Sequence, residues 1–401
     1  MKKLPDGWRW VKLGEHVRKL GSGFTPCGGH ATYQSSGVPL IRSQNVHMNR
    51  FVNDGLAFIS DEQDEEMAAS RVQAGDVLLN ITGASIGRVC VAPSEVCPAN
   101  VNQHVCVIRG DSALDPDFLA FYLATPDFQK FVLDSQAGAT RQALTKAMIE
   151  DFQIPFTELS EQRRIAGVLR EQMAAVASAR RIAEAQLEAG QTLPAAYLRA
   201  TFSSPEAQQW PRKRLGEVLN PRNEVVHPRD KPTGAATFVG MEHIESGTGK
   251  LMDSLSVKMS ELTGRKPRFY KGDIVYAYLR PYLNKVWMAD FDGLCSVDQY
   301  VFAVDSAKAD RELIAWFLRS PVYLERAPIN TSPGYLPRIR TEEVLGVELN
   351  LPPLTDQHRI AAELSERLAG VERLRRGLAE QLEAIGKLPA ALLREAFSGR
   401  I

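Results

Sequence analysis

The chain has 401 residues, of which 44% are hydrophobic and 24% charged, and its 48 basic and 48 acidic residues give a formal net charge of zero. This is the composition of an ordinary globular protein, long enough for roughly two to four domains. A run of 18 apolar residues, a signal-peptide core and a C-x-x-C pair among the five cysteines are all absent, so we expect a cytoplasmic protein with reduced thiols and no membrane span.

The first distinctive segment is NITGASIGRV, residues 80–89, which follows the strand-like run VLLN. It looks like the glycine-rich turn of a dinucleotide-binding enzyme. Such a turn must lead into a helix whose N-terminus faces the phosphates, and here RVCVAP follows, which predicts a strand. An acidic ribose partner about twenty residues downstream is also missing. The pattern therefore argues against a nicotinamide-dependent redox enzyme.

A long helix is predicted next, and its sequence returns 195 residues later. LSEQRRIAGVLREQMAAV begins at Leu159 and LTDQHRIAAELSERLAGV at Leu354, and by direct count 23 of the 46 positions in 158–203 are identical in the second copy. Weaker matches lie outside this window: Gly-Asp-Val at 75–77 corresponds to Gly-Asp-Ile at 272–274. We therefore predict two mixed α/β domains, 1–157 and 204–352, each followed by a repeated helix, 158–203 and 353–401.

Both helices carry apolar residues at heptad spacing, which indicates a coiled coil. The heptad core positions of each helix form a seam. Its side chains are small in the first copy where they are large in the second, so we predict that the two helices pack on each other antiparallel. Each seam has an arginine at one core position, Arg180 or Arg375, and we expect the prolines 194 and 389 to start short terminal helices. The alternative is a pair of ordinary amphipathic surface helices. The predicted interface comprises Leu169, Met173, Val176, Leu187, Leu364, Leu368, Val371, Leu378, Leu382 and Ile385.

The second globular region allows the segment at 80–89 to be compared with its counterpart. At an offset of 197, NITGASIGRV pairs with AYLRPYLNKV, so that the glycines become Arg280 and Asn284. A phosphate-binding loop could not accept this exchange, whereas a surface loop that presents different side chains could. We interpret the segment as a position where the two copies differ in what they contact.

Motifs for catalysis are missing from the sequence. It contains no H-E-x-x-H, no phosphate-binding G-x-x-x-x-G-K-[ST], and no Asn/Asp-Pro-Pro-Tyr/Phe methyltransferase tetrapeptide. Asp76 and Asp273 follow glycines, a pattern more typical of a turn into a buried strand than of a metal nuclease. We therefore expect no catalytic residue and no metal site.

Two divergent regions separated by near-identical helices resemble the specificity subunit of type I restriction–modification systems. The segments PLTDQHRIA, WRWVKLGE, PLIRSQNV and GDVLLN are in the style of that family, although Glu158 stands where its proline would precede the first helix. The resemblance implies a non-catalytic, sequence-specific DNA-binding subunit with two target recognition domains, each contacting one half of a bipartite double-stranded site. It also implies docking of two adenine methyltransferase subunits that carry S-adenosylmethionine, and a restriction subunit, with ATP and Mg, that can join.

Two alternatives stay open: a specificity subunit of a fused or non-type-I methyltransferase, and a coiled-coil scaffold without a DNA role. Candidate DNA contacts are the Arg, Lys, Asn, Gln, hydroxyl and aromatic side chains that recognise bases and phosphates. In the first copy they are Arg42, Ser43, Gln44, Asn45, Thr82, Ser85, Arg88, Thr140, Arg141 and Gln142. In the second copy they are Arg265, Lys266, Arg268, Arg280, Tyr282, Asn284, Lys285, Tyr335 and Arg338.

Overall fold

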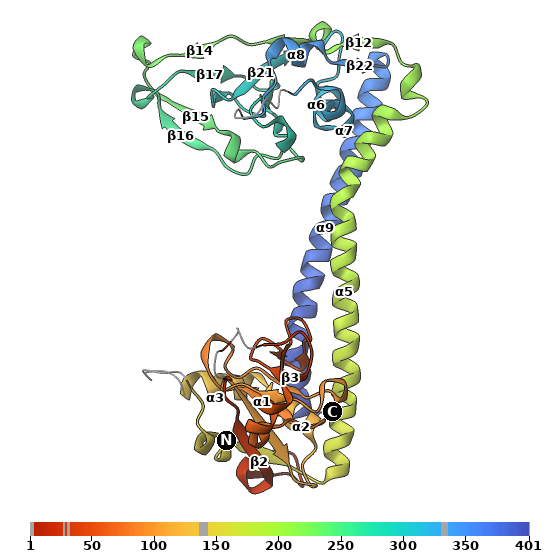
Figure 1. Ribbon diagram of the computed structural model, residues 1–401. Coiled ribbons are helices and arrows are strands. Elements are labelled where there is room, and N and C mark those ends of the chain that lie inside the picture. Colours follow the sequence, from red (N-terminus) through yellow and green to blue (C-terminus); the bar gives the residue numbers. More distant parts are fainter. Residues whose placement is uncertain (1–3, 27–28, 30–32, 136–142, 330–335, 401) are drawn as a thin grey trace. The chain divides into compact units, whose positions relative to one another are not determined.

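The computed structural model describes residues 4–26, 29, 33–135, 143–329 and 336–400. It divides into two compact units, one formed by Met1–Glu184 with Glu380–Ile401 and the other by Ala185–Ala379 (Figure 1). Each unit contains one globular region and a section of both long helices. The boundaries of the recognition domains given above remain a prediction.

A four-stranded antiparallel sheet in the order β2-β10-β7-β8 forms the centre of the first unit. Its strands are β2 (Val17–Ser22), β10 (Val105–Gly110), β7 (Val77–Asn80) and β8 (Val89–Val91). Side chains of β7 alternate between two cores: Val77 and Leu79 face a cluster that includes the helices, and Leu78 faces a second cluster. The sheet is therefore covered on both faces, which explains why VLLN is a continuous apolar run.

The remaining elements of this unit surround the central sheet. The strands are β1 (Arg9–Lys12), which pairs with β11 (Gln153–Phe156); β3 (Val38–Ile41), between β6 (Ala57–Ile59) and β9 (Asn100–Val101); and the pair β4 (Val46–His47) and β5 (Arg50–Phe51). The helices are α1 (Asp61–Glu66), α2 (Pro116–Leu123), α3 (Pro126–Ser135) and α4 (Lys146–Glu150).

The second unit repeats this plan, which confirms the predicted duplication of a mixed α/β domain. Its central sheet has the matching order β13-β21-β18-β19, built from β13 (Leu219–Pro221), β21 (Gln299–Val304), β18 (Ile274–Ala277) and β19 (Val286–Met288). The pair β12 (Arg212–Arg214) and β22 (Glu348–Asn350) corresponds to β1 and β11. A five-stranded sheet contains β14 (Val225–Val226), β17 (Lys266–Phe269), β20 (Gly293–Cys295), β15 (Ala235–Val239) and β16 (Leu255–Lys258), and the helices are α6 (Arg311–Arg319), α7 (Pro321–Arg326) and α8 (Thr341–Gly346).

The two Gly-Asp turns have a structural role. The carboxylate of Asp76 is buried, accepts a hydrogen bond from the backbone N–H of Gln73 at 2.7 Å and pairs with Arg109 at 2.7 Å. Asp273 is buried in the same way and pairs with Arg222 at 2.6 Å. Each carboxylate thus anchors the turn into a central strand, in agreement with the interpretation from the sequence.

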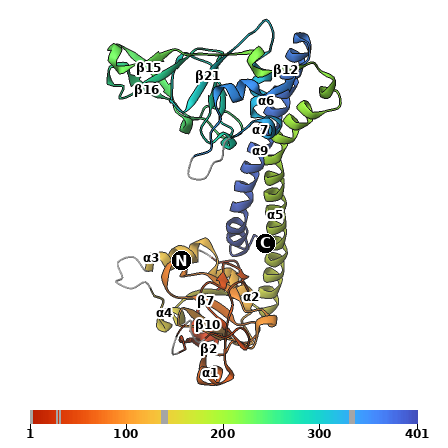
Figure 2. The same cartoon turned by 45° about the horizontal axis from the view of Figure 1, so that its top comes forward.

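The long helices are α5 (Leu159–Ser203) and α9 (Leu354–Ala396), and in each unit they lie side by side (Figures 1 and 2). In the first unit the start of α5, at Leu169, shares a core with the end of α9, at Leu393. In the second unit the end of α5, at Leu198, shares a core with the start of α9, at Leu364. Early residues of one helix therefore meet late residues of the other, which confirms antiparallel packing.

Most of the first core positions of the heptad seam are buried in both helices, whereas Val176 is half-buried. Six of the buried residues, none more than 7% exposed, are Leu169, Ala183, Leu364, Val371, Leu378 and Ile385. The prediction that proline restarts each helix was wrong, because α5 continues through Pro194 and α9 through Pro389. The residues beyond each proline pack into a domain core, and this burial offsets the lost backbone hydrogen bond.

The arginine in the second seam is explained by the glycine opposite it. A Cβ built on Gly190 would lie 3.4 Å from Cγ of Arg375, so the arginine stem packs directly over the glycine. The guanidinium of Arg375 reaches Glu372 at 3.5 Å. The small and large seams predicted from the sequence therefore meet here.

A buried glutamine joins the start of each long helix to its globular region. In the first unit Gln162, which is 0% exposed, accepts from the N–H of Asp115 at 2.9 Å and donates to the carbonyls of Ala113 at 2.9 Å and Thr157 at 2.8 Å. Gln357 makes the equivalent three hydrogen bonds in the second unit. This explains why glutamine recurs in both copies of the helix.

The end of α9 completes the core of the first unit. Phe397 lies 5.1 Å from Phe118, 5.3 Å from Tyr122 and 6.4 Å from Trp8, measured between ring centroids. Its counterpart Phe202, at the end of α5, packs in the core of the second unit in the same way. The last residues of the chain therefore take the place in the first unit that α5 takes in the second.

Candidate nucleic-acid interface

A polar hollow of about 510 Å³ opens on the first unit where three strands end. It brings together five of the residues predicted from the sequence, contributed by the loops after β3 and β7, together with a histidine from the loop between β9 and β10. Its lining includes Ser43, Gln44, Thr82, Ser85, Arg88 and His104. Hydroxyl, amide, imidazole and guanidinium groups that converge in this way are suited to recognise base edges and phosphates.

Buried side chains hold these three loops together. The amide of Asn80, at the end of β7, donates to the carbonyl of Ser43 at 2.9 Å. Thr82 Oγ1 and His104 Nδ1 lie 2.6 Å apart, which links the loop after β7 to the loop before β10. His104 was not selected from the sequence, although its place in the repeated Asn-Gln-His-Val segment could have indicated it. The hollow is therefore a rigid arrangement of distant segments.

Two of the predicted residues beside the hollow are engaged within the protein. Asn45 is 0% exposed, and its amide donates to the carbonyl of Val52 at 2.9 Å, so it shapes the loop after β3 and is not accessible to a duplex. Arg42 stacks over the ring of Tyr33, 5.4 Å from its centroid, and donates to a backbone carbonyl. Thr140, Arg141 and Gln142 lie outside the described residues.

The corresponding loop of the second unit carries a different set of side chains. Arg280 and Tyr282 are exposed, Tyr282 by 55%. Lys285 Nζ donates to the carbonyl of Met241 at 2.7 Å, and the amide of Asn284 donates to the carbonyl of Arg319, so both have internal partners. Of the four predicted residues in this loop, Arg280 and Tyr282 are the ones directed to solvent.

Both loops have left-handed residues at the same two positions. Gly83 and Gly87 have φ of 72° and 85°, and the residues at the matching positions, Arg280 and Asn284, both have φ of 52°. The residue three positions after the first left-handed residue donates its N–H to that residue's carbonyl in both loops, at 3.0 Å and 2.9 Å. The glycines of the first loop therefore serve a left-handed turn and not a phosphate.

Basic residues also line the region beside this loop. Lys266 lies over the ring of Phe238 with Nζ 5.0 Å from its centroid, and Arg268 belongs to β17. Tyr278 stacks on Tyr300 with centroids 4.3 Å apart, and burial raises the pKa of Tyr278 while the nearby Arg265 and Arg338 lower it. This tyrosine pair was missed from the sequence; its member Tyr300 occupies the position of His104 in the first unit. Tyr335 lies outside the described residues.

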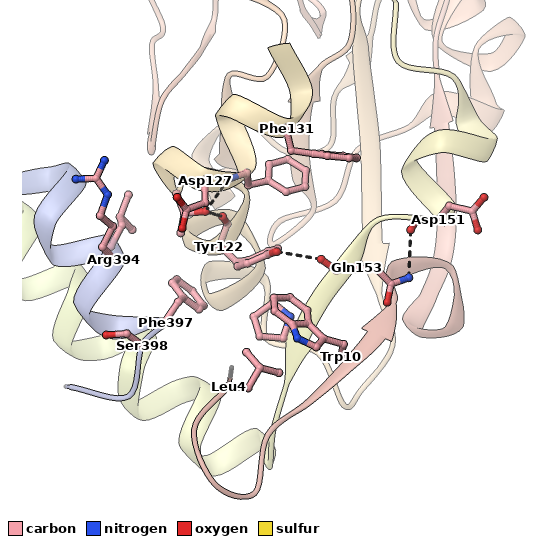
Figure 3. Close-up of a pocket in the computed structure, with 14 residues that line it drawn as sticks. Leu4, Trp10, Tyr122, Asp127, Phe131, Asp151, Gln153, Arg394, Phe397 and Ser398 are labelled. Atoms are coloured by element: carbon pink, nitrogen blue, oxygen red, sulfur yellow. Dashed lines mark hydrogen bonds between the residues drawn. The ribbon is translucent and has the colours of Figure 1, made fainter. Parts of the chain in front are cut away.

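A second hollow of the first unit, also of about 510 Å³, is aromatic (Figure 3). Trp10, Tyr122, Phe131 and Phe397 line it, and Tyr122 donates to the carbonyl of Gln153 at 3.0 Å. Burial raises the pKa of Tyr122, which disfavours a phenolate nucleophile.

The corresponding surface of the second unit is lined by charged side chains in place of aromatic ones. Arg212 pairs with Glu348 at 3.2 Å, and Arg326 donates to the carbonyl of Glu348 at 2.9 Å. These residues line a charged hollow where the first unit has aromatic rings. The two copies are therefore alike in backbone and unlike in this surface.

Within the described residues, no group of three His, Cys, Asp or Glu side chains is placed to hold a metal ion. The described cysteines are free thiols, three of them buried. In the same part of the chain, no helix is both long and apolar enough to cross a membrane.

Comparison with known proteins agrees with this arrangement. Residues 5–185 match the family model of the type I restriction modification DNA specificity domain. The type I restriction enzyme EcoDI specificity subunit of Escherichia coli is 28% identical over 192 residues, which are 48% of this chain and 42% of that protein. The StySPI specificity subunit of Salmonella potsdam is 20% identical over 100% of this chain and 90% of its own length.

Solved structures share the fold over the full chain. One from a study of complex assembly and conformational transition of the type I R-M system has a TM-score of 0.73 at 22% identity, covering 100% of both chains. The HsdS subunit from Thermoanaerobacter tengcongensis has a TM-score of 0.66 at 20% identity, covering 100% of this chain and 99% of that chain. At these identities the likeness establishes the fold.

Residues 5–185 thus define a domain of the DNA-specificity class. Beyond residue 185 the duplicated fold continues, and the solved structures share that fold. Along its full length the chain is similar to type I restriction enzyme specificity subunits.

Proposed function

We propose that this chain recognises a bipartite double-stranded DNA site, one half with each globular region, and does so without catalysing a reaction. The single observation that carries the proposal is the pair of matching loops, 82–88 and 279–285, which share two left-handed positions and one backbone hydrogen bond but carry different side chains. Recognition of two unlike DNA sequences requires different side chains on the same scaffold, and the two loops provide them.

We further propose that two identical modification methyltransferase subunits dock on the repeated helices. Several solvent-exposed residues are identical in both copies, among them Arg181 with Arg376 and Glu188 with Glu383. Packing of the two helices does not require identity at exposed positions, so a partner that meets both copies is the physical reason for it. The aromatic hollow has no equivalent in the second unit and is therefore unsuited to this shared contact.

The cofactors in this proposal belong to the partners. S-adenosylmethionine is bound by the methyltransferase subunits, which methylate adenine, and ATP and Mg by a restriction subunit that can join. The contribution of this chain is the placement of two recognition surfaces on a pair of rigid helices, which sets the gap between the half-sites.

Mapping of adenine methylation with and without the gene tests the recognition function. The expected result is a split motif that is methylated in the parent strain, disappears on deletion and returns when the gene is supplied again. An unchanged methylation pattern would contradict the proposal.

Co-purification with a type I modification subunit tests the docking surface. Charge reversal at both repeated positions, Arg181→Glu with Arg376→Glu, should abolish the complex with two methyltransferases, and either single change should leave a complex with one. Arg163→Glu is the matched control, because Arg163 is exposed and its counterpart is His358. Equal retention of the partner by the double variant and the control would show that docking lies elsewhere.

A further inference from the structure

The turn at Arg280 has an unfavourable backbone conformation. Its φ of 52° lies in the left-handed region, where side chains with a Cβ are disfavoured, and the matching residue of the first unit is glycine. Two contacts hold the turn: the N–H of Arg280 donates to the carbonyl of Pro337 at 2.7 Å, and Leu283 donates to the carbonyl of Arg280 at 2.9 Å. Glycine would make the same turn without strain, so the arginine is present for its side chain.

Arg280 also carries the positive charge of this loop that is free to contact a ligand, because the neighbouring polar side chains are bound within the protein. Lys285 donates to the carbonyl of Met241, and the amide of Asn284 to the carbonyl of Arg319. Among the described residues, Arg280 has no hydrogen-bond or ion-pair partner for its guanidinium, and it is exposed beside Tyr282. The fixed turn therefore presents one guanidinium and one phenol to solvent.

We propose that Arg280 is the specificity-determining residue of the second globular region and that it contacts the O6 and N7 edge of a guanine in the major groove. This inference rests on the proposed function. A phosphate contact tolerates a flexible side chain on any exposed backbone, whereas bidentate recognition of a base edge requires a fixed direction of approach. The strained and hydrogen-bonded turn supplies that fixed direction.

Replacement by glycine and by alanine separates the contact from the strain. Arg280→Gly keeps the left-handed turn and removes the side chain, so the urea midpoint should stay unchanged or rise. Arg280→Ala keeps the strain and should be less stable than Arg280→Gly. Both variants should lose about tenfold to hundredfold in affinity for the native site, measured on the complex with its methyltransferase. A purely structural role for Arg280 predicts loss of stability in both variants and overturns the proposal.

Lys231→Gly provides the matched control, because Lys231 is an exposed cation with a left-handed φ of 46° and lies outside the loop 279–285. This change should relieve the same kind of strain and leave the recognised sequence as it is. The recognised sequence is obtained from methylation mapping of each variant complex. With Arg280→Gly the second half-site should become degenerate at one guanine, while the first half-site and the gap are unchanged.

Three results would overturn the proposal: a second half-site without guanine, an Arg280→Gly variant with the native motif, and a loss of affinity that is equal on all sequences. The last would identify a phosphate contact. If the unaltered chain directs no split methylation, the proposed function fails together with this inference. If it does and Arg280→Gly has no effect on the motif, only this inference fails.

Discussion

Replacement of the buried glutamine at the start of α5 is the most direct test of how the helix is joined to the first globular region. In Gln162→Glu the side chain keeps its size, and the new carboxylate can still accept from Asp115. It cannot donate, so the carbonyls of Ala113 and Thr157, at 2.9 Å and 2.8 Å in the native protein, lose their partner and face an anion. Each buried carbonyl left unpaired costs about 1–3 kcal/mol, so we expect a loss of about 4 kcal/mol.

For a unit of this size about 1 kcal/mol lowers the melting temperature by roughly 2–4 °C, so the expected decrease is roughly 8–16 °C, measured by differential scanning calorimetry. Gln186→Glu is the control, because Gln186 is exposed on the same helix, and its melting temperature should change by less than about 2 °C. Gln357→Glu should repeat the large decrease in the second unit.

The effect of Gln162→Glu should also depend on pH. Burial among carbonyls disfavours the charged form of the new carboxyl, so its pKa in the folded state is raised, and stability should recover as the pH falls toward 5. If Gln162→Glu and the Gln186→Glu control had the same melting temperature at neutral pH, these three hydrogen bonds would not be what joins the helix to the domain.

Further predictions concern a close backbone contact, the end of α9 and the buried thiols. Gly23→Ala should destabilise the first unit by about 2 kcal/mol in urea unfolding, because the new Cβ would lie 1.7 Å from a backbone oxygen, whereas Gly21→Ala meets nothing within 4 Å and should be neutral. Phe397→Ala should lower the free energy of unfolding by about 3 kcal/mol, whereas Leu388→Ala, at a 43% exposed position, should lower it by less than about 0.5 kcal/mol. Equal effects would contradict the packing role of Phe397 in the first unit. Burial raises the pKa of three thiols from 9.0 to about 12. Their contribution to stability is therefore present below pH 9 and is lost as the pH rises toward 12. A thiol reagent at pH 8 should label them only in urea. They are Cys90, Cys106 and Cys295.

The two copies of the repeat use the same buried contacts. Gln162 and Gln357 make the same hydrogen bonds, and Phe202 and Phe397 fill the same place in their cores. The loops that contain Gly83 and Arg280, in contrast, differ in the side chains that they present. Shared contacts of this kind are expected where packing constrains both copies in the same way.

The amino-acid sequence by itself determined the duplication, the two long helices and their pairing. These features depend on periodicity and on identity along one helix, as with Leu364, Val371 and Leu378, and such patterns are local. The sequence also placed a variable loop at 82–88, because comparison of its two copies requires no coordinates.

The tertiary structure alone decided which residues share a surface. His104 joins Thr82 and Ser43 because the loops that follow β3, β7 and β9, strands of two different sheets, meet in space, and Asn45 is buried within the loop after β3. The left-handed turn of Arg280 was equally invisible in the sequence, since arginine carries no conformational signal for it. Contacts between segments far apart in the chain depend on how sheets and loops close in space, and a one-dimensional pattern does not encode that closure residue by residue.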